Sequence, residues 1–291
     1  MTPANASGPA SGSAADPEES SGSCRAGEVF DARAIDNEMA GSGSAHPGFH
    51  PYRDLRDELL CLPPQAWIAR CNRLAGARGL RSAGGAPLRF VAATDAQDAL
   101  GYEAAILHEG RVACRAEGRG AIHDLHNALV WLAFPAVKST LNRLHVDAAH
   151  ARQRGRGRVR DVATLLDESG LLWWSGDRRL DAQLESRNWR ALLVDNRARV
   201  AARVRPIVIG HGLLEKLAAP YKAMTAHCLV CNRDASVADD ALDTSAAVRL
   251  AAAFAAGGVP KLAPLPILGL PGWDPGNVDP SYYDDARVFR A

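Results

Sequence analysis

The chain contains no apolar run that could cross a membrane, and its cysteines do not follow a disulfide pattern. A membrane helix needs about 20 consecutive apolar residues, and no segment of the 291-residue sequence provides them. The N-terminus lacks the basic-then-apolar pattern of a secretory signal, and its acidic residues argue against a transit peptide. The six cysteines are scattered along the chain, unlike a disulfide framework. These absences predict a cytoplasmic protein without a membrane partner.

Lysine is also scarce. Only four of the 34 basic residues are lysines, and together with abundant alanine this bias is typical of a GC-rich bacterial genome. The formal net charge is only +1, so the overall charge does not indicate nucleic acid or an anionic membrane as a partner. One local exception is the segment from Arg152 to Arg160, RQRGRGRVR, which could contact phosphates. We interpret it as a solvated insertion loop.

The composition changes near residue 49. Residues 1–48 are rich in Ser, Gly, Ala and Pro and nearly free of branched and aromatic residues, which predicts a disordered tail. Residues 49–291 have enough apolar residues for one globular domain. Helical patterns outnumber strand patterns there, so we expect an α+β fold with a β-hairpin and a small mixed sheet.

The periodicity of apolar residues predicts the individual elements. The expected helices cover residues 55–74 (broken at Pro63-Pro64), 122–134, 135–152, 159–168, 181–200, 213–219 and 236–256. The expected strands cover residues 88–92, 171–175, 205–209 and 227–230, and residues 102–107 and 111–115 are expected to form the hairpin.

Residues 123–145, HDLHNALVWLAFPAVKSTLNRLH, place polar side chains in an otherwise apolar helical stretch. Burying such groups costs free energy unless they are hydrogen-bonded or used. We therefore expect a site here, built from the following residues: His123, Asp124 and Asn127 on the first helix, and Lys138, Asn142 and His145 on the second.

Two further segments carry groups that could complete such a site. Gly210-His211-Gly212 lies where a strand ends and a helix begins, with Glu215 one turn later. Asp167 and Glu168 end a helix just before a strand. Histidine nitrogens and carboxylate oxygens together could hold a divalent metal, although no HExxH motif fixes the geometry.

Four ordered segments resemble one known family. They are HDLHNALVWLAFPAVKSTLN, RDVATLLDESGLLWW, IGHGLLEKLAAPY and LPILGLPGWDPGNVDPSYYDDARVFR. From about residue 49 to the C-terminus the chain resembles the bacterial domain-of-unknown-function family 3025. The resemblance implies no established activity, and aromatic residues stand in the family pattern where this chain has Ile122 and His126.

The leading functional hypothesis is a hydrolase-type enzyme, metal-assisted or using metal-free acid–base catalysis. Its catalytic residues would be His123, Asp124, His211 and Glu168, and its substrate contacts Asn127, Lys138, Asn142 and Glu215. This hypothesis requires His123 and His211 to meet in one cleft.

Two alternatives stay open. One is a non-catalytic protein- or RNA-binding module, in which His123, Asp124 and Asn127 only tie the helix to its neighbours. The other is a redox protein that uses the single CxxC motif, Cys228 to Cys231, although its apolar interior fits a strand better than a redox turn.

Overall fold

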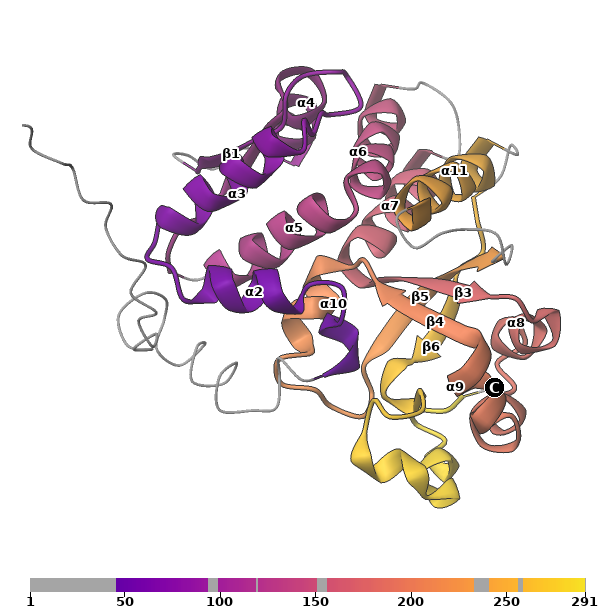
Figure 1. Cartoon of the computed structure of the whole chain (residues 1–291). Coiled ribbons are helices and arrows are strands. Elements are labelled where there is room, and N and C mark those ends of the chain that lie inside the picture. The colour runs from indigo at the N-terminus through magenta and orange to yellow at the C-terminus, as the bar shows by residue number, and fades with distance from the viewer. Residues whose placement is uncertain are drawn as a thin grey trace, which may run out of the picture.

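The computed structural model describes residues 46–93, 99–118, 120–150, 156–232, 241–255 and 259–290. The predicted tail lies outside the described residues except for its last three, which open a short 3₁₀-helix at Pro47–Phe49. The structure confirms the predicted α+β class and the small mixed sheet. Figure 1 shows helices α3 to α7 on one side of the molecule and the four-stranded sheet with α8 and α9 on the other.

The predicted N-terminal helix is confirmed as two helices, α2 (Arg53–Leu60) and α3 (Ala66–Ala77). They are separated at Pro63-Pro64 because proline lacks the backbone N–H that would continue the helix. In α3 the side chains of Trp67, Ile68 and Cys71 are buried, as expected for one apolar stripe of a helix.

The predicted β-hairpin at residues 102–107 and 111–115 is wrong. The first segment belongs to helix α4 (Ala99–Glu109), and only the second forms a strand, β2 (Arg111–Cys114). Strand β2 pairs in parallel with β1 (Arg89–Ala92), and parallel strands need a crossover connection, which α4 supplies. The short apolar segment fitted strand and helix periodicity equally well.

Helices α5 (Ala121–Ala133) and α6 (Pro135–His150) confirm the two helices predicted on either side of Pro135. Proline is favoured at the first position of a helix, where its missing N–H costs no hydrogen bond. The next two N–H groups of α6, from Ala136 and Val137, donate to the carboxylate of Asp243 at 2.8 and 3.0 Å. Most residues of α5 are buried, including the polar residues Asp124, His126 and Asn127, whereas His123 is partly exposed.

The main sheet has the strand order β4-β3-β5-β6. Strand β3 (Gly170–Ser175) is fully buried and pairs antiparallel with β4 (Val204–Val208) and parallel with β5 (Thr225–Asn232). The edge strand β6 (Ala263–Pro266) was not predicted, because Pro264 and Pro266 are typical loop signals. The remaining helices are α7 (Arg156–Ser169), α8 (Arg178–Glu185), a π-helix (Arg190–Asp195), α9 (Arg197–Arg203), α10 (His211–Lys216) and α11 (Leu242–Ala255).

The prediction of one continuous helix at residues 181–200 is therefore wrong. It is three segments, broken where Arg187 adopts a φ of 55°. A non-glycine residue with positive φ interrupts a right-handed helix. The helix predicted at residues 236–256 is confirmed only from Leu242, and residues 233–240 lie outside the described part.

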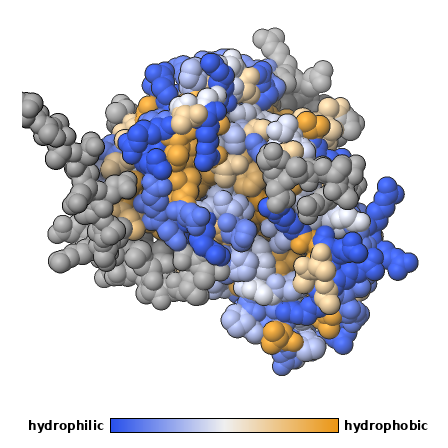
Figure 2. Space-filling view, in the orientation of Figure 1, coloured by the Kyte–Doolittle hydropathy of each residue, from blue (hydrophilic) through white to orange (hydrophobic). Residues whose placement is uncertain are grey.

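The buried apolar side chains form one contiguous cluster that extends from Phe49 to Phe289. Hydrophilic side chains cover most of the face shown in Figure 2. None of the described helices is long and apolar enough to span a membrane. A single domain over residues 49–291 stays a prediction, which the contiguous core favours.

The pairing of β3 with β4 explains how distant segments meet. In their antiparallel register Leu171 is opposite Val208, so the end of α7 lies beside the beginning of α10. Helix α10 packs on both α5 and α7. The first turn of α5, the last turn of α7 and the first turn of α10 thus come together at one end of the sheet.

Candidate functional site

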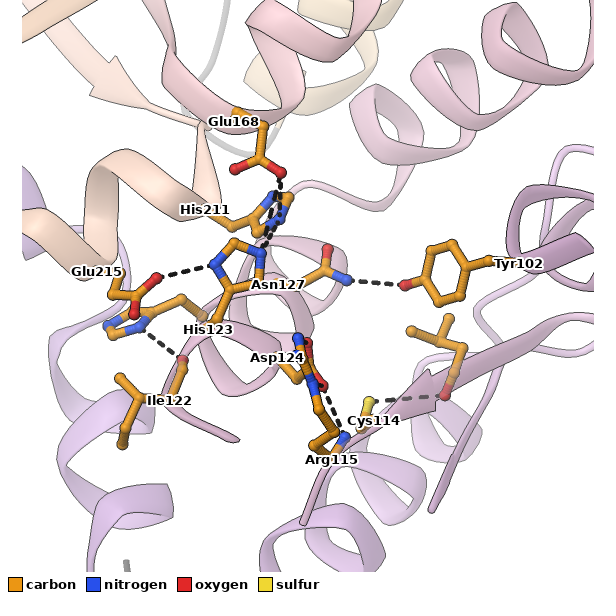
Figure 3. A network of polar contacts seen from close by, with 12 residues as sticks. Tyr102, Cys114, Arg115, Ile122, His123, Asp124, Asn127, Glu168, His211 and Glu215 are labelled. Carbon is orange, nitrogen blue, oxygen red and sulfur yellow. Dashed lines mark hydrogen bonds and ion pairs between the residues drawn. The ribbon is translucent and has the colours of Figure 1, made fainter. Parts of the chain in front are cut away.

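His123, Glu168 and His211, which we call the His–Glu–His cluster, come from α5, α7 and α10 and point toward one another (Figure 3). The Nε2 atoms of His123 and His211 are 3.0 Å apart. Oε1 of Glu168 lies 3.5 Å from Nε2 of His211 and 3.9 Å from Nε2 of His123. The two histidines that the sequence hypothesis required to meet are therefore in contact.

Glycines on both sides of His211 make this approach possible. A Cβ at Gly210 would lie only 2.4 Å from the backbone N of Gly170, and a Cβ at Gly212 only 2.5 Å from Oε2 of Glu168. At Gly210 the neighbouring atoms are backbone atoms, so this close approach requires glycine, whereas a side chain at Gly212 would displace the Glu168 carboxylate. The Gly-His-Gly motif therefore allows α10 to pack closely against the end of α7, where Glu168 lies.

A carboxylate orients the imidazole of His123, whereas Nδ1 of His211 is buried near a carboxylate without a hydrogen bond to it. Nδ1 of His123 donates to Oε2 of Glu215 at 2.8 Å, one helical turn after His211 on α10. Nδ1 of His211 lies 3.8 Å from Oδ2 of Asp167. A carboxylate at Nδ1 fixes the orientation of the ring and aims Nε2 at a ligand. Both Nε2 atoms therefore face the same point.

Burial and the neighbouring charges shift the pKa values of the cluster in different directions. The hydrogen bond to Glu215 raises the pKa of His123, whereas burial lowers the pKa of His211 to about 3. Burial also raises the pKa of Glu168. The two histidine shifts agree with one arrangement: without a metal, Nε2 of a protonated His123 donates to the neutral His211.

The three inward-facing atoms have the spacing of a metal site. They form a triangle with sides of 3.0, 3.5 and 3.9 Å. The circle through its corners has a radius of about 2.0 Å, which matches zinc–nitrogen and zinc–oxygen bonds of about 2.0–2.2 Å. An ion at bonding distance from all three atoms would thus lie in or just outside their plane, with further positions open.

Asp124 does not join the cluster. It is buried and accepts three hydrogen bonds of 2.7 Å from Arg115: one from the backbone N–H, one from Nε and one from Nη2. A carboxylate held by one edge of a guanidinium and by a backbone N–H is committed to that partner. Asp124 therefore positions Arg115, a residue that the sequence reasoning missed because nothing local to strand β2 marks it.

The cluster lies in the wall of a cleft of about 800 Å³, which is within the usual size range of small-molecule sites. The face of α7 that carries Glu168 forms one side of it, and β2 and α5 contribute to another. The lining residues are Ala93, Leu100, Tyr102, Glu103, Ala113, Arg115, His123, Asp124, Asn127, His145, Ala149, Arg160, Thr164, Asp167, Glu168 and His211.

Lys138 and Asn142 do not line this cleft. Lys138 is buried, and its Nζ donates to Oδ1 of Asp167 at 2.5 Å. Although burial alone would raise the pKa of Asp167, the Lys138 ammonium lowers it to about 2. Asn142 donates to the backbone carbonyl and to Oε2 of Glu103 at 2.9 and 2.6 Å. Both residues support the wall of the cleft from behind.

Asn127 does line the cleft, but its Nδ2 donates to the hydroxyl of Tyr102 at 3.0 Å. Glu215 holds His123 instead of facing the cleft. The structure therefore brings together His123, His211, Glu168 and Glu215, and separates them from Lys138 and Asn142. Glu103, whose pKa burial and the charge of Asp167 raise to about 7, lines the cleft and was not predicted.

His126 faces away from the cluster. Its Nδ1 donates to the backbone carbonyl of Ile122 at 2.9 Å, and its ring packs near Phe49. Burial lowers the pKa of His126 to about 3. It is a core histidine.

The redox hypothesis for Cys228 and Cys231 finds no support. Both thiols are free and buried in β5, and burial raises the pKa of Cys228 and brings that of Cys231 to about 12. A redox-active thiol needs a lowered pKa and access. Of the predicted loop from Arg152 to Arg160, residues 152–155 lie outside the described part, and the rest belongs to α7.

The comparison with protein families gives one match. Residues 88–291 match the family described as Protein of unknown function (DUF3025), and the chain belongs to this family, as the four segments in the sequence indicated. Neither the curated proteins nor the solved structures gave a match.

Proposed function

We propose that this protein is a metal-dependent hydrolase whose divalent ion is held by His123, His211 and Glu168. The observation that carries the proposal is that both Nε2 atoms and Oε1 of Glu168 lie on a circle of metal-bonding radius while Glu215 accepts from Nδ1 of His123. Three protein ligands that leave further positions open are typical of catalytic sites, as opposed to structural ones.

The ion and the residues around it would have different roles in hydrolysis. A bound divalent ion lowers the pKa of a coordinated water toward 7 and polarises the bond to be hydrolysed. Glu215 accepts from Nδ1 of His123 and so leaves Nε2 of that ring to face the ion. Glu103 lines the same cleft, and with its pKa near 7 it could exchange a proton with substrate at neutral pH.

The proposal is tested by titrating metal-free protein with Zn²⁺ and Mn²⁺ by calorimetry, with metal content measured in parallel. We expect one ion per chain for wild-type protein. His123→Ala should weaken binding by more than about 100-fold, because losing a ligand costs more than losing an outer hydrogen-bond partner. His145→Ala is the matched control, because His145 lines the same cleft outside the cluster. Equal affinity in wild type and His123→Ala would reject the proposal.

A second candidate is metal-free acid–base catalysis. It is favoured by the chain of contacts from Glu215 through His123 to His211, which could pass a proton within the cleft. The two candidates separate in a single assay: activity that survives complete removal of metal by a chelator supports the metal-free form.

The binding-module hypothesis has less support. It predicts a continuous exposed apolar or basic patch. The large exposed apolar side chains of the described residues belong to four separate segments: Leu100, Tyr221, Val248 and Val278. We propose the bacterial cytoplasm as the setting of the enzyme, because arginine far outnumbers lysine, alanine is abundant and the six cysteines do not follow a disulfide spacing.

A further inference from the structure

Arg115 has a position that its partner Asp124 explains only in part. The guanidinium has five N–H donors, and two of them, one at Nε and one at Nη2, donate to the Asp124 carboxylate. Among the described residues no acceptor takes the other three, which form the Nη1–Nη2 edge. The side chain is 51% exposed and lines the cleft.

The chain also makes room for this guanidinium. A Cβ at Gly120 would lie 2.4 Å from Nη1 and 2.5 Å from Cζ of Arg115. Gly120 has a φ of 99°, which other residues rarely adopt. The glycine lets Arg115 lie flat against the loop that begins α5, three residues before His123. The guanidinium thus lies close to Gly120, beside the first turn of the helix that carries His123.

A second arginine faces the same space. Arg160 lines the cleft, as do Thr164, Asp167 and Glu168, which follow it on one face of α7. Eight residues of helix separate Arg160 from Glu168, about 12 Å at 1.5 Å per residue. Within the described part of the chain Arg160 has no ion-pair partner, whereas Lys138 is committed to Asp167.

We propose that Arg115 binds the phosphoryl group of a phosphate-ester substrate beside the His–Glu–His cluster; this proposal rests on the proposed function and names its substrate class. A phosphoryl group offers several acceptor oxygens and up to two negative charges, which suit three guanidinium donors next to a dication. A carboxylate has one charge and two oxygens. The organic part of the ester would occupy the rest of the cleft, along Leu100, Tyr102 and Ala113.

The reaction would be hydrolysis, and it needs only water as co-reactant. The water oxygen forms a new bond to phosphorus while the phosphorus–oxygen ester bond breaks with its electron pair on the leaving oxygen. One proton of the water goes to the alcohol that leaves, and the other goes to the phosphate or to solvent. Arg115 would stabilise the negative charge on the phosphoryl oxygens throughout.

The test measures binding of inorganic phosphate by calorimetry to the full chain, metal-free and loaded with one equivalent of Zn²⁺. Arg115→Lys keeps a positive charge beside the Asp124 carboxylate but loses the planar arrangement of N–H donors of the guanidinium. We expect it to weaken phosphate binding by at least about tenfold while the Zn²⁺ affinity and the thermal midpoint stay near wild type. Arg158→Gln, an exposed arginine on α7 outside the cleft lining, is the matched control. Gly120→Ala should displace the guanidinium and weaken phosphate binding like Arg115→Lys.

Each outcome decides a different claim. Zn²⁺ binding with equal phosphate affinity in wild type and Arg115→Lys would overturn the role of Arg115 and leave the metal site standing. Acetate binding as tightly as phosphate would overturn the phosphoryl assignment. Absence of Zn²⁺ binding would contradict the proposed function. The metal-free titrations would still decide on Arg115, because unchanged phosphate affinity in Arg115→Lys would reject it there as well.

Discussion

Two groups of polar side chains lie side by side in this protein and differ in what they bind. Behind the cleft, Lys138 pairs with Asp167, and Nδ2 of Asn142 donates to Glu103, so the charged groups have partners within the chain. In the His–Glu–His cluster three ligand atoms face one another instead. Buried polar groups normally find partners, and a cluster whose atoms converge on an open point is the arrangement that an ion would complete. On α7 the neighbouring residues Asp167 and Glu168 thus belong to different groups, one paired within the chain and the other facing the cluster.

The largest expected effect lies behind the cleft. Lys138→Met should lower the free energy of unfolding by about 3–5 kcal/mol, because it leaves the Asp167 charge buried without a partner. His123 is 28% exposed and its ion pairs are only half-buried, so His123→Ala should cost no more than about 1 kcal/mol. Urea unfolding at pH 7 measures both. The control is Lys138→Met with Asp167→Asn, which removes both charges and should recover part of the loss; no recovery would contradict the pairing argument.

The next effect concerns pH and the core histidine. His126 takes up a proton below pH 6.5 when unfolded but only near pH 3 when folded, so the unfolded state binds more protons between these values. Stability is therefore lost as the pH falls through this window, by about 3 kcal/mol between pH 6.5 and 4. His126→Phe should reduce this dependence by about that amount in urea unfolding at a series of pH values, while His211, whose pKa burial also lowers to about 3, keeps its own contribution. Parallel curves for wild type and variant would show that His126 is not the group responsible.

A smaller effect tests the outer shell of the cluster. Glu215→Gln keeps the shape of the side chain but removes the charge that accepts from Nδ1 of His123. Metal affinity should fall by about 10–100-fold, measured by Zn²⁺ titration with a competing chelator. The exposed residue Glu185 provides the control variant Glu185→Gln, which should bind as wild type does. If both variants bind equally, Glu215 is not an orienting residue.

The smallest effect is expected at the pair of Asn127 and Tyr102. Tyr102→Phe removes one hydrogen bond of 3.0 Å and should cost about 1 kcal/mol of stability. Zn²⁺ affinity should not change, because neither residue contacts the cluster atoms. A marked loss of Zn²⁺ affinity in this variant would contradict the separation between the polar side chains that stabilise the fold and those that bind the ion.

The sequence predicted local structure better than long-range contacts. The helices around Pro135 and the strand at residues 171–175 follow from periodicity and proline chemistry, and both are confirmed. The segment at residues 102–107 was misassigned because six apolar-rich residues fit either period, and only the parallel pairing of β1 with β2 requires a helix there. Strand β6 was missed because its edge position tolerates prolines that would break a central strand.

The sequence predicted most residues of the site, but it did not predict which of them contact one another. Spacing placed His123 on a buried helix and His211 at a strand end, and their contact follows from the β3–β4 register, which the sequence alone does not give. The pairing of Lys138 with Asp167 and of Asp124 with Arg115 depends on which helices pack together. Arg115 was missed because its role comes from Gly120 and Asp124, which approach it in space.

The central claim is tested most directly by a crystal soaked in Zn²⁺ and measured at the zinc absorption edge. The account predicts one anomalous peak about 2.0–2.2 Å from Nε2 of His123, Nε2 of His211 and a carboxylate oxygen of Glu168. A soaked crystal in which these atoms keep their direct contact and no peak lies between them would contradict it.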